Sequence, residues 1–160
     1  MRRVTRRREV PLMIDVTRAE VKDHGVVTGL LLDFAGEVGW KPEADRDRWD
    51  RVIAELLNSD GWIFLIARDG EAPVGLAVVN FFLSLYGSRE QGRISALIID
   101  EDHRREGVAT RLMQDSLAAA RRRGCRELEA SVGPQSAQET FYTAFGFSSE
   151  RRLLLWSCDE

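Results

Sequence analysis

The segment from Leu97 to Thr110 changes its pattern midway, and this change constrains the fold more than any other feature of the chain. Leu97, Ile98 and Ile99 are consecutive apolar residues, which indicate a strand buried on both faces. A charged loop follows, and from Gly107 onward apolar residues recur at helical spacing: Val108, Ala109, Leu112, Met113 and Leu117. A buried strand, a short loop and an amphipathic helix together predict a layered domain of mixed α and β structure.

The start of this helix has the features of an anion-binding site. The first turn of any helix carries unbonded N–H groups and a partial positive charge, and such an end can bind phosphate without dedicated side chains. Gly107 would let the backbone approach a bulky anion, and the small side chain of Ala109 leaves the next turn similarly unobstructed. Thr110 offers a hydroxyl donor. The pattern alone leaves an alternative open, in which Gly107 is an ordinary loop glycine beside two solvated arginines, Arg104 and Arg105.

The remaining segments predict one mixed sheet with helices on both faces. Apolar runs and alternation predict six strands, at residues 12–16, 62–68, 74–85, 93–100, 126–132 and 152–156. Helical spacing predicts four helices, at residues 19–36, 49–57, 107–123 and 137–145. We expect a polar, glycine-bearing loop at residues 86–92. A chain of 160 residues fits one domain, and no internal repeat or linker divides it.

The arginines crowded into residues 1–8 set the start of the chain apart. We expect residues 1–12 to form a flexible basic arm and residues 13–160 to form the single domain, with Met13 as an alternative first residue. Such an arm can bind nucleic acid. The formal net charge of −3 and the lack of interleaved aromatics argue against a nucleic-acid partner.

Composition also bears on compartment and on metal binding. No apolar run approaches the length of a membrane span and no secretory signal pattern is visible, so we expect a cytoplasmic protein with no membrane partner. Cys125 and Cys158 lack the spacing of metal ligands, and neither histidine, His24 or His103, has a cysteine near it. We therefore expect no metal site.

Two motifs are similar to those of a known family. Residues 104–109, Arg-Arg-Glu-Gly-Val-Ala, fit the signature Gln/Arg-x-x-Gly-x-Gly/Ala at every fixed position. Residues 141–147, Phe-Tyr-Thr-Ala-Phe-Gly-Phe, resemble the family's second aromatic segment. On these residues the chain resembles the GNAT superfamily of N-acetyltransferases, and the similarity of element order extends from residue 12 to residue 156. The resemblance implies a mostly antiparallel mixed sheet in which a splayed pair of strands holds coenzyme A.

The resemblance also implies a reaction and its residues. Acetyl-CoA would be the cosubstrate of a bacterial-like enzyme that acetylates a primary amine of a small molecule or peptide by direct attack. Backbone groups of Leu97, Ile98 and Ile99 would pair with the pantetheine arm, and Tyr142 would protonate the departing thiolate. Backbone N–H groups of the following turn would hold the pyrophosphate: Arg104, Arg105, Glu106, Gly107, Val108, Ala109 and Thr110. A homodimer is a further expectation, since dimers are common in such folds.

The chain departs from the family pattern at two positions. Many relatives carry a carboxylate where this chain has Ser95 or Ala96, so no general base is assigned there, and Gln135 replaces a common asparagine. The remaining candidates for the base are Asp100, Glu90 and Glu37. A non-catalytic acyl-CoA-binding module on the same fold is the alternative function. Four aromatic residues would either line an acceptor pocket or pack in the core: Trp40, Phe81, Phe82 and Tyr86.

Overall fold

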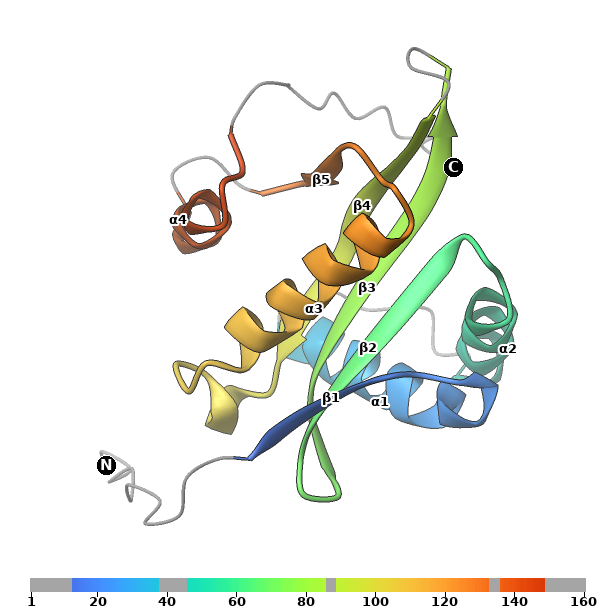
Figure 1. Ribbon diagram of the computed structural model, residues 1–160. Coiled ribbons are helices and arrows are strands. Elements are labelled where there is room, and N and C mark those ends of the chain that lie inside the picture. Colours follow the sequence, from blue (N-terminus) through green and yellow to red (C-terminus); the bar gives the residue numbers. More distant parts are fainter. Residues whose placement is uncertain (1–12, 38–45, 86–88, 133–135, 149–160) are drawn as a thin grey trace, which may run out of the picture.

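The computed structural model describes residues 13–37, 46–85, 89–132 and 136–148. Within them lies one five-stranded sheet in the order β1-β2-β3-β4-β5 (Figure 1). Neighbouring strands are antiparallel from β1 to β4, and β5 runs parallel to β4. The mixed, mostly antiparallel sheet is confirmed. The strands are β1 (Ile14–Arg18), β2 (Trp62–Asp69), β3 (Ala72–Ser84), β4 (Arg89–Ile99) and β5 (Leu128–Ala130).

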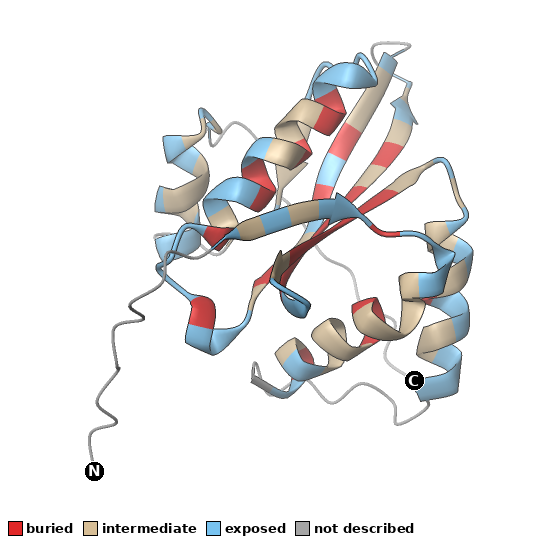
Figure 2. Ribbon diagram, turned by 60° about the horizontal axis from the view of Figure 1, so that its bottom comes forward, coloured by how far each residue is buried: buried red, intermediate tan, exposed pale blue. Residues whose placement is uncertain are grey.

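Helices cover both faces of this sheet, as expected. Figures 1 and 2 show α1 and α2 against one face, and α3 and α4 on the other. Each face has its own buried cluster, because side chains alternate along every strand. Ile63 and Leu65 pack toward α3, whereas Phe64 and Ile66 pack toward α1 and α2. The helices are η1 (Val21–Asp23), α1 (His24–Glu37), α2 (Arg46–Leu57), η2 (Glu101–His103), α3 (Val108–Arg122) and α4 (Ala137–Ala144).

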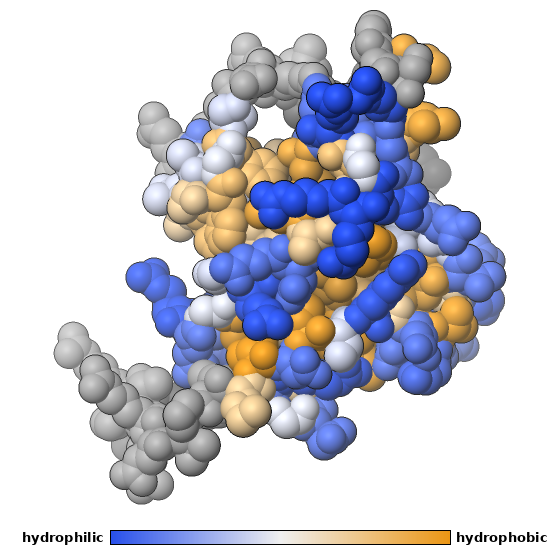
Figure 3. Space-filling view, viewed as in Figure 1, coloured by the Kyte–Doolittle hydropathy of each residue, from blue (hydrophilic) through white to orange (hydrophobic). Residues whose placement is uncertain are grey.

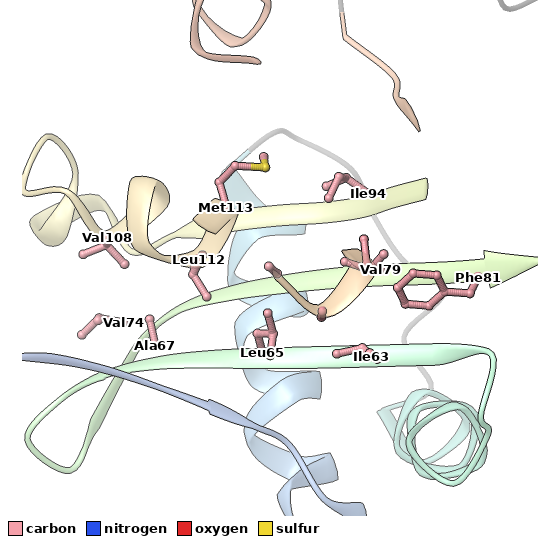
Figure 4. Close-up of a cluster of buried hydrophobic side chains, with 13 residues drawn as sticks. Ile63, Leu65, Ala67, Val74, Val79, Phe81, Ile94, Val108, Leu112 and Met113 are labelled. Carbon is pink, nitrogen blue, oxygen red and sulfur yellow. The ribbon is translucent and has the colours of Figure 1, made fainter. Parts of the chain in front are cut away.

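The first turns of α3 are anchored on β2 and β3. Val108, Leu112 and Met113 are buried and lie in the cluster between α3 and the sheet (Figure 4). Burial of each such side chain contributes about 1.5–3 kcal/mol. Gly75 of β3 lets the helix approach closely, because a Cβ atom there would lie only 3.1 Å from Val108 Cγ1 and from Leu112 Cδ1. The start of α3 is therefore held in a fixed place above the sheet.

The apolar run at the end of β4 is buried from both faces, as its sequence predicts. Ile98 belongs to the cluster under α1 and α2, whereas Leu97 and Ile99 pack against the cluster under α3. Side chains of one run thus contribute to both layers of the core.

Several predicted boundaries are wrong. The predicted loop at 86–92 contains the start of β4, because Arg89 pairs with Ser84 and lengthens the β3–β4 hairpin. The first helix begins at His24, not at residue 19, because Glu20 and Asp23 form a capping box around η1. Strand β5 is shorter than predicted. The predicted strand at 152–156 and the predicted arm at 1–12 lie outside the described residues.

Candidate functional site

The turn that precedes α3 presents bare backbone amides. Gly107 is the N-cap residue, has a left-handed φ of 85°, and offers no side chain to cap the helix. The first hydrogen bond of the helix runs from the N–H of Arg111 to the carbonyl of Gly107, at 3.0 Å. The N–H groups of Val108, Ala109 and Thr110 precede that bond, so they have no partner within the helix. Residues 104–107 and Thr110 are exposed, which leaves this turn accessible to a ligand.

The backbone of the turn is held in an uncommon conformation. Arg105 has a φ of 66°, and it is the only non-glycine residue of the described chain with a positive φ. Left-handed backbone costs a non-glycine residue roughly 1–2 kcal/mol. Left-handed residues within a turn direct successive N–H groups toward one side, and such concave arrays bind anions. A Cβ atom on Gly107 would meet no other atom within 4 Å, so the space beside the turn is open.

Arg104 is tied to the end of the preceding strand. Its Nε atom donates a hydrogen bond to the carbonyl of Ile99 at 3.2 Å. The guanidinium therefore joins the turn to β4, a contact that the sequence does not reveal. Arg105 and Glu106 are exposed on the same turn.

Strand β5 is short and pairs with β4 along its whole length. The ladder joins residues 92–94 to residues 128–130, whereas β4 continues beside β3 as far as Ile99. Beyond Ile94 a gap that no described strand fills therefore lies along the outer edge of β4. The N–H of Asp100 donates to the carbonyl of Val74 at 3.0 Å, and backbone direction alternates along a strand. Leu97 and Ile99 therefore direct their backbone groups away from β3, whereas Ile98 directs its own toward β3. Of the three residues predicted to pair with a pantetheine arm, Leu97 and Ile99 face the gap.

A β-bulge lies where the pairing of β4 with β5 ends. Val78 is opposite Ala96 and Val79 is opposite Ile94, so Ser95 is the extra residue on β4. Bulges bend a strand and increase its twist, so the bulge marks the start of the unpaired outer edge of β4. From the sequence, Ser95 is notable only for the lack of a carboxylate. The bulge appears in the structure as a change of face, because Ile94 packs in the cluster under α3 whereas Ala96 packs against the cluster under α1 and α2.

Tyr142 lies on α4, which is on the same face of the sheet as α3 (Figure 1). Its ring contacts those of Phe141 and Phe147 edge-on, with centroids 5.6 and 5.2 Å away. Phe141, Phe145 and Phe147 pack against the core cluster. In the space-filling view, apolar side chains gather over α4, and charged ones cover much of α3 (Figure 3). Burial raises the pKa of Tyr142, so its hydroxyl is protonated at neutral pH.

Comparison with known proteins decides the family. The model of the acetyltransferase (GNAT) family matches residues 27–147. The chain belongs to this family. It is 38% identical over 90 residues to N-alpha-acetyltransferase 30 of Schizosaccharomyces pombe, a match that covers 55% of this chain and 59% of the relative. It is 26% identical over 114 residues to an uncharacterized N-acetyltransferase of Methanocaldococcus jannaschii, which covers 69% of this chain and 50% of the relative. The chain thus spans little more than half the length of these relatives.

Solved structures share the fold. The structure of AAC(6')-Iy in complex with the bisubstrate analog CoA-S-monomethyl-acetylneamine superposes with a TM-score of 0.77 at 19% identity. The superposition covers 91% of this chain and 98% of that one. The mixed sheet with helices on both faces is therefore the GNAT fold.

Two of the three candidates for the general base of this GNAT protein are held by other groups. The Arg123 guanidinium donates to both carboxylate oxygens of Glu90, at 2.8 and 2.6 Å, and lowers the pKa of Glu90. Asp100 accepts the N–H of Asp102 at 3.1 Å and lies 2.8 Å from the ring of His103. The side chain of Glu37, the third candidate, lies outside the described part of the structure. Both described carboxylates are thus already engaged, Glu90 by a guanidinium and Asp100, through Oδ1, by the backbone and His103.

The predicted acceptor aromatics have different surroundings. Phe81 is buried in the α3-side core, with the Arg123 guanidinium 4.5 Å above its ring, so of the two roles left open for it the structure supports core packing. Phe82 is half-buried and lies 5.7 Å from the Arg93 guanidinium. Trp40, Tyr86 and the loop residue Gln135 lie outside the described residues.

The described residues give no sign of other chemistry. They contain no group of three or more His, Cys, Asp or Glu side chains arranged to hold a metal ion. Cys125 donates its thiol to the carbonyl of Glu127 at 3.0 Å, and burial raises its pKa, which disfavours a reactive thiolate. Among the helices that the structure describes, none is long and apolar enough to cross a membrane.

Proposed function

We propose that this GNAT protein is an acetyl-CoA-dependent N-acetyltransferase that acetylates a primary amine by direct attack. The observation that carries the proposal is the turn from Arg105 to Thr110, where backbone amides without a backbone partner lie at an exposed helix start. The N–H of Arg104, which the family resemblance implies would bind the pyrophosphate as well, donates instead to the carbonyl of Glu101 at 3.4 Å. Family membership supports the acetyl transfer itself.

The coenzyme would lie across two adjoining features. Its pyrophosphate would accept hydrogen bonds from the amides of Arg105, Glu106, Gly107, Val108, Ala109 and Thr110, with Arg104 bracing the turn through Ile99. Its pantetheine arm would pair with the backbone of Leu97 and Ile99, as an added strand in the gap between β4 and β5. The coenzyme A analog bound to the similar structure of AAC(6')-Iy supports this choice of ligand.

The acceptor amine has to lose a proton before it attacks. An alkylamine with a pKa near ~10.4 is mostly charged at pH 7, which costs roughly 4–5 kcal/mol. Desolvation in the gap would lower that pKa. Because Asp100 and Glu90 are already engaged, we propose that water carries the proton to bulk solvent.

The transfer forms a C–N bond and breaks the C–S bond of the thioester. Negative charge develops on the carbonyl oxygen, and the N–H of Ile99, which faces the gap, would stabilise it. The electron pair of the broken bond goes to sulfur. Tyr142 would donate its proton to that thiolate and regain one from solvent, which is consistent with a raised pKa that keeps the hydroxyl protonated.

The acceptor is a small molecule or a peptide. Similar proteins include an N-alpha-acetyltransferase and an enzyme crystallised with an analog that contains acetylneamine, so the comparisons support both classes. The net charge of −3 favours a cationic acceptor of either kind.

Release of free thiol from acetyl-CoA over a panel of amines tests the proposal. We expect thiol release that depends on one class of amine and that Gly107→Glu strongly reduces at acetyl-CoA concentrations below saturation. The second candidate function is a non-catalytic acyl-CoA-binding module, which the absence of a carboxylate at Ser95 and Ala96 favours. That module would bind coenzyme A but would release no thiol from acetyl-CoA with any amine.

A further inference from the structure

His103 is a buried histidine that the proposed chemistry does not use. It ends η2, immediately before the coenzyme turn, and only 9% of it is exposed. Its Nδ1 atom lies 2.8 Å from Asp100 Oδ1, and its Nε2 atom lies 3.7 Å from Asp69 Oδ2. Asp100 follows β4 and Asp69 ends β2. One imidazole ring therefore lies between carboxylates from two different strands.

The ring belongs to a compact network at the entrance to the turn. Asp100 accepts two backbone hydrogen bonds, from Asp102 to its side chain at 3.1 Å and from His103 to its carbonyl at 3.0 Å. Its own N–H donates to the carbonyl of Val74 on β3 at 3.0 Å. The η2 segment is thus fixed to the sheet by both backbone and side chain, and His103 is its last residue.

The turn that follows needs such support. Arg105, two residues after His103, has the left-handed φ of 66° that is unfavourable for a residue with a side chain. A strained conformation of this kind persists only where the surrounding structure enforces it. On its other side the turn is fixed by Val108, which is buried under α3. His103 and Val108 are therefore the two buried residues that bracket the exposed turn.

We propose that His103 is a positioning residue for the coenzyme. By contacting both Asp100 and Asp69, the ring holds the turn in the conformation that directs the amides of residues 105–110 toward the pyrophosphate. The inference rests on the proposed function, because it concerns affinity for coenzyme A. It adds a role for residues outside the binding turn itself.

A role in packing alone predicts a different response to substitution. His103→Leu keeps most of the apolar volume but removes both nitrogen atoms. His103→Asn places an amide nitrogen near the position of Nδ1 and can keep the hydrogen bond to Asp100. His103→Gln reaches toward the position of Nε2 and can keep the contact with Asp69. If only packing matters, Leu is tolerated best, whereas a positioning role requires that Asn restores binding in part.

The experiment measures two quantities on the full chain: the dissociation constant of coenzyme A by calorimetry, and hydrogen exchange without ligand at the hydrogen-bonded amides that flank the turn, those of Asp102, His103, Arg104 and Arg111. For His103→Leu we expect roughly tenfold weaker binding and faster exchange confined to these flanking amides, and for His103→Asn a smaller change in both. Asp69→Asn should weaken binding in the same direction. The matched control is His24→Asn, since His24 also lies beside a carboxylate, that of Asp50 at 3.5 Å, but on α1.

The outcomes separate the two proposals. If the folded His103→Leu protein binds coenzyme A as tightly as the wild type does, the inference is overturned but the proposed function is not. A wild-type protein that binds no coenzyme A overturns the proposed function and the inference with it. Weaker binding in His103→Leu that comes with faster exchange throughout the domain assigns the residue to packing, and it also overturns the inference.

Discussion

Replacement of Gly107 by glutamate separates coenzyme binding from stability. The left-handed φ of 85° would cost a residue with a side chain about 1–2 kcal/mol of folding free energy. A carboxylate at a helix N-terminus stabilises the helix by about 0.3–1 kcal/mol, which offsets part of this cost. No atom lies within 4 Å of the new Cβ, so no steric term is added. We expect a net loss of stability of about 1 kcal/mol, which is too small to unfold a typical domain.

The effect on the coenzyme is expected to be much larger. Two like charges about 4 Å apart repel by about 4 kcal/mol at the effective dielectric constant of a protein surface. Solvent in this exposed turn would reduce that figure to about 2–3 kcal/mol. Affinity for coenzyme A should therefore fall roughly 30- to 150-fold, measured by calorimetry, while the urea midpoint moves only slightly.

Gly124→Glu is the matched control. Gly124 follows the other end of α3, has a φ of 72°, and also has no atom within 4 Å of its Cβ position. The backbone strain is of the same kind, and the carboxylate at the negative end of the helix dipole adds to the loss of stability. Gly124→Glu should thus be the less stable protein and yet bind coenzyme A normally. Equal affinity of wild type and Gly107→Glu would refute the reasoning.

Three further changes test other parts of the account. Tyr142→Phe should lower kcat about tenfold or more with unchanged affinity for coenzyme A, since the thiolate can leave unaided but benefits from a proton; unchanged turnover would remove Tyr142 from the mechanism. Arg123→Ala should destabilise the fold by about 1–2 kcal/mol in urea titrations at pH 7. Because the pair lowers the folded-state pKa of Glu90 from its ordinary value of 4.5, that difference should shrink as the pH falls below 4.5, to the part due to the contacts of Arg123 with the Asp60 carbonyl and the Phe81 ring. A pH-independent difference would contradict the assignment. Gly92→Ala should cost about 1–3 kcal/mol because its Cβ would lie 2.7 Å from Leu128 Cδ1. Adding Leu128→Ala should relieve part of this strain, and no relief would contradict the clash as its cause.

Much of the fold follows from local patterns in the sequence. The run from Leu97 to Ile99 predicts a strand buried on both faces, and the structure confirms it because each residue packs into one of two clusters. The amphipathic helix after Gly107 is confirmed for the same reason, since Val108 and Leu112 are buried. These features depend on the period of apolar residues, which a single sequence displays directly.

Other features depend on contacts between distant segments, so the sequence conceals them. The start of β4 is polar, and only its pairing with the end of β3 reveals that Arg89 lies in a strand. The bulge at Ser95 depends on the register between two strands. The role proposed for the ring of His103 depends on its contact with Asp69, which is 34 positions earlier in the chain. Phe81 gives no local sign that it packs under Arg123 instead of lining a pocket.

The central claim is that bare amides at the start of α3 bind the pyrophosphate of coenzyme A. A crystal structure of the full chain with coenzyme A tests it most directly. We expect the diphosphate oxygens within hydrogen-bond distance of the N–H groups of Val108, Ala109 and Thr110, and the pantetheine arm between β4 and β5. A coenzyme bound elsewhere, with this turn in contact with solvent alone, would contradict the account.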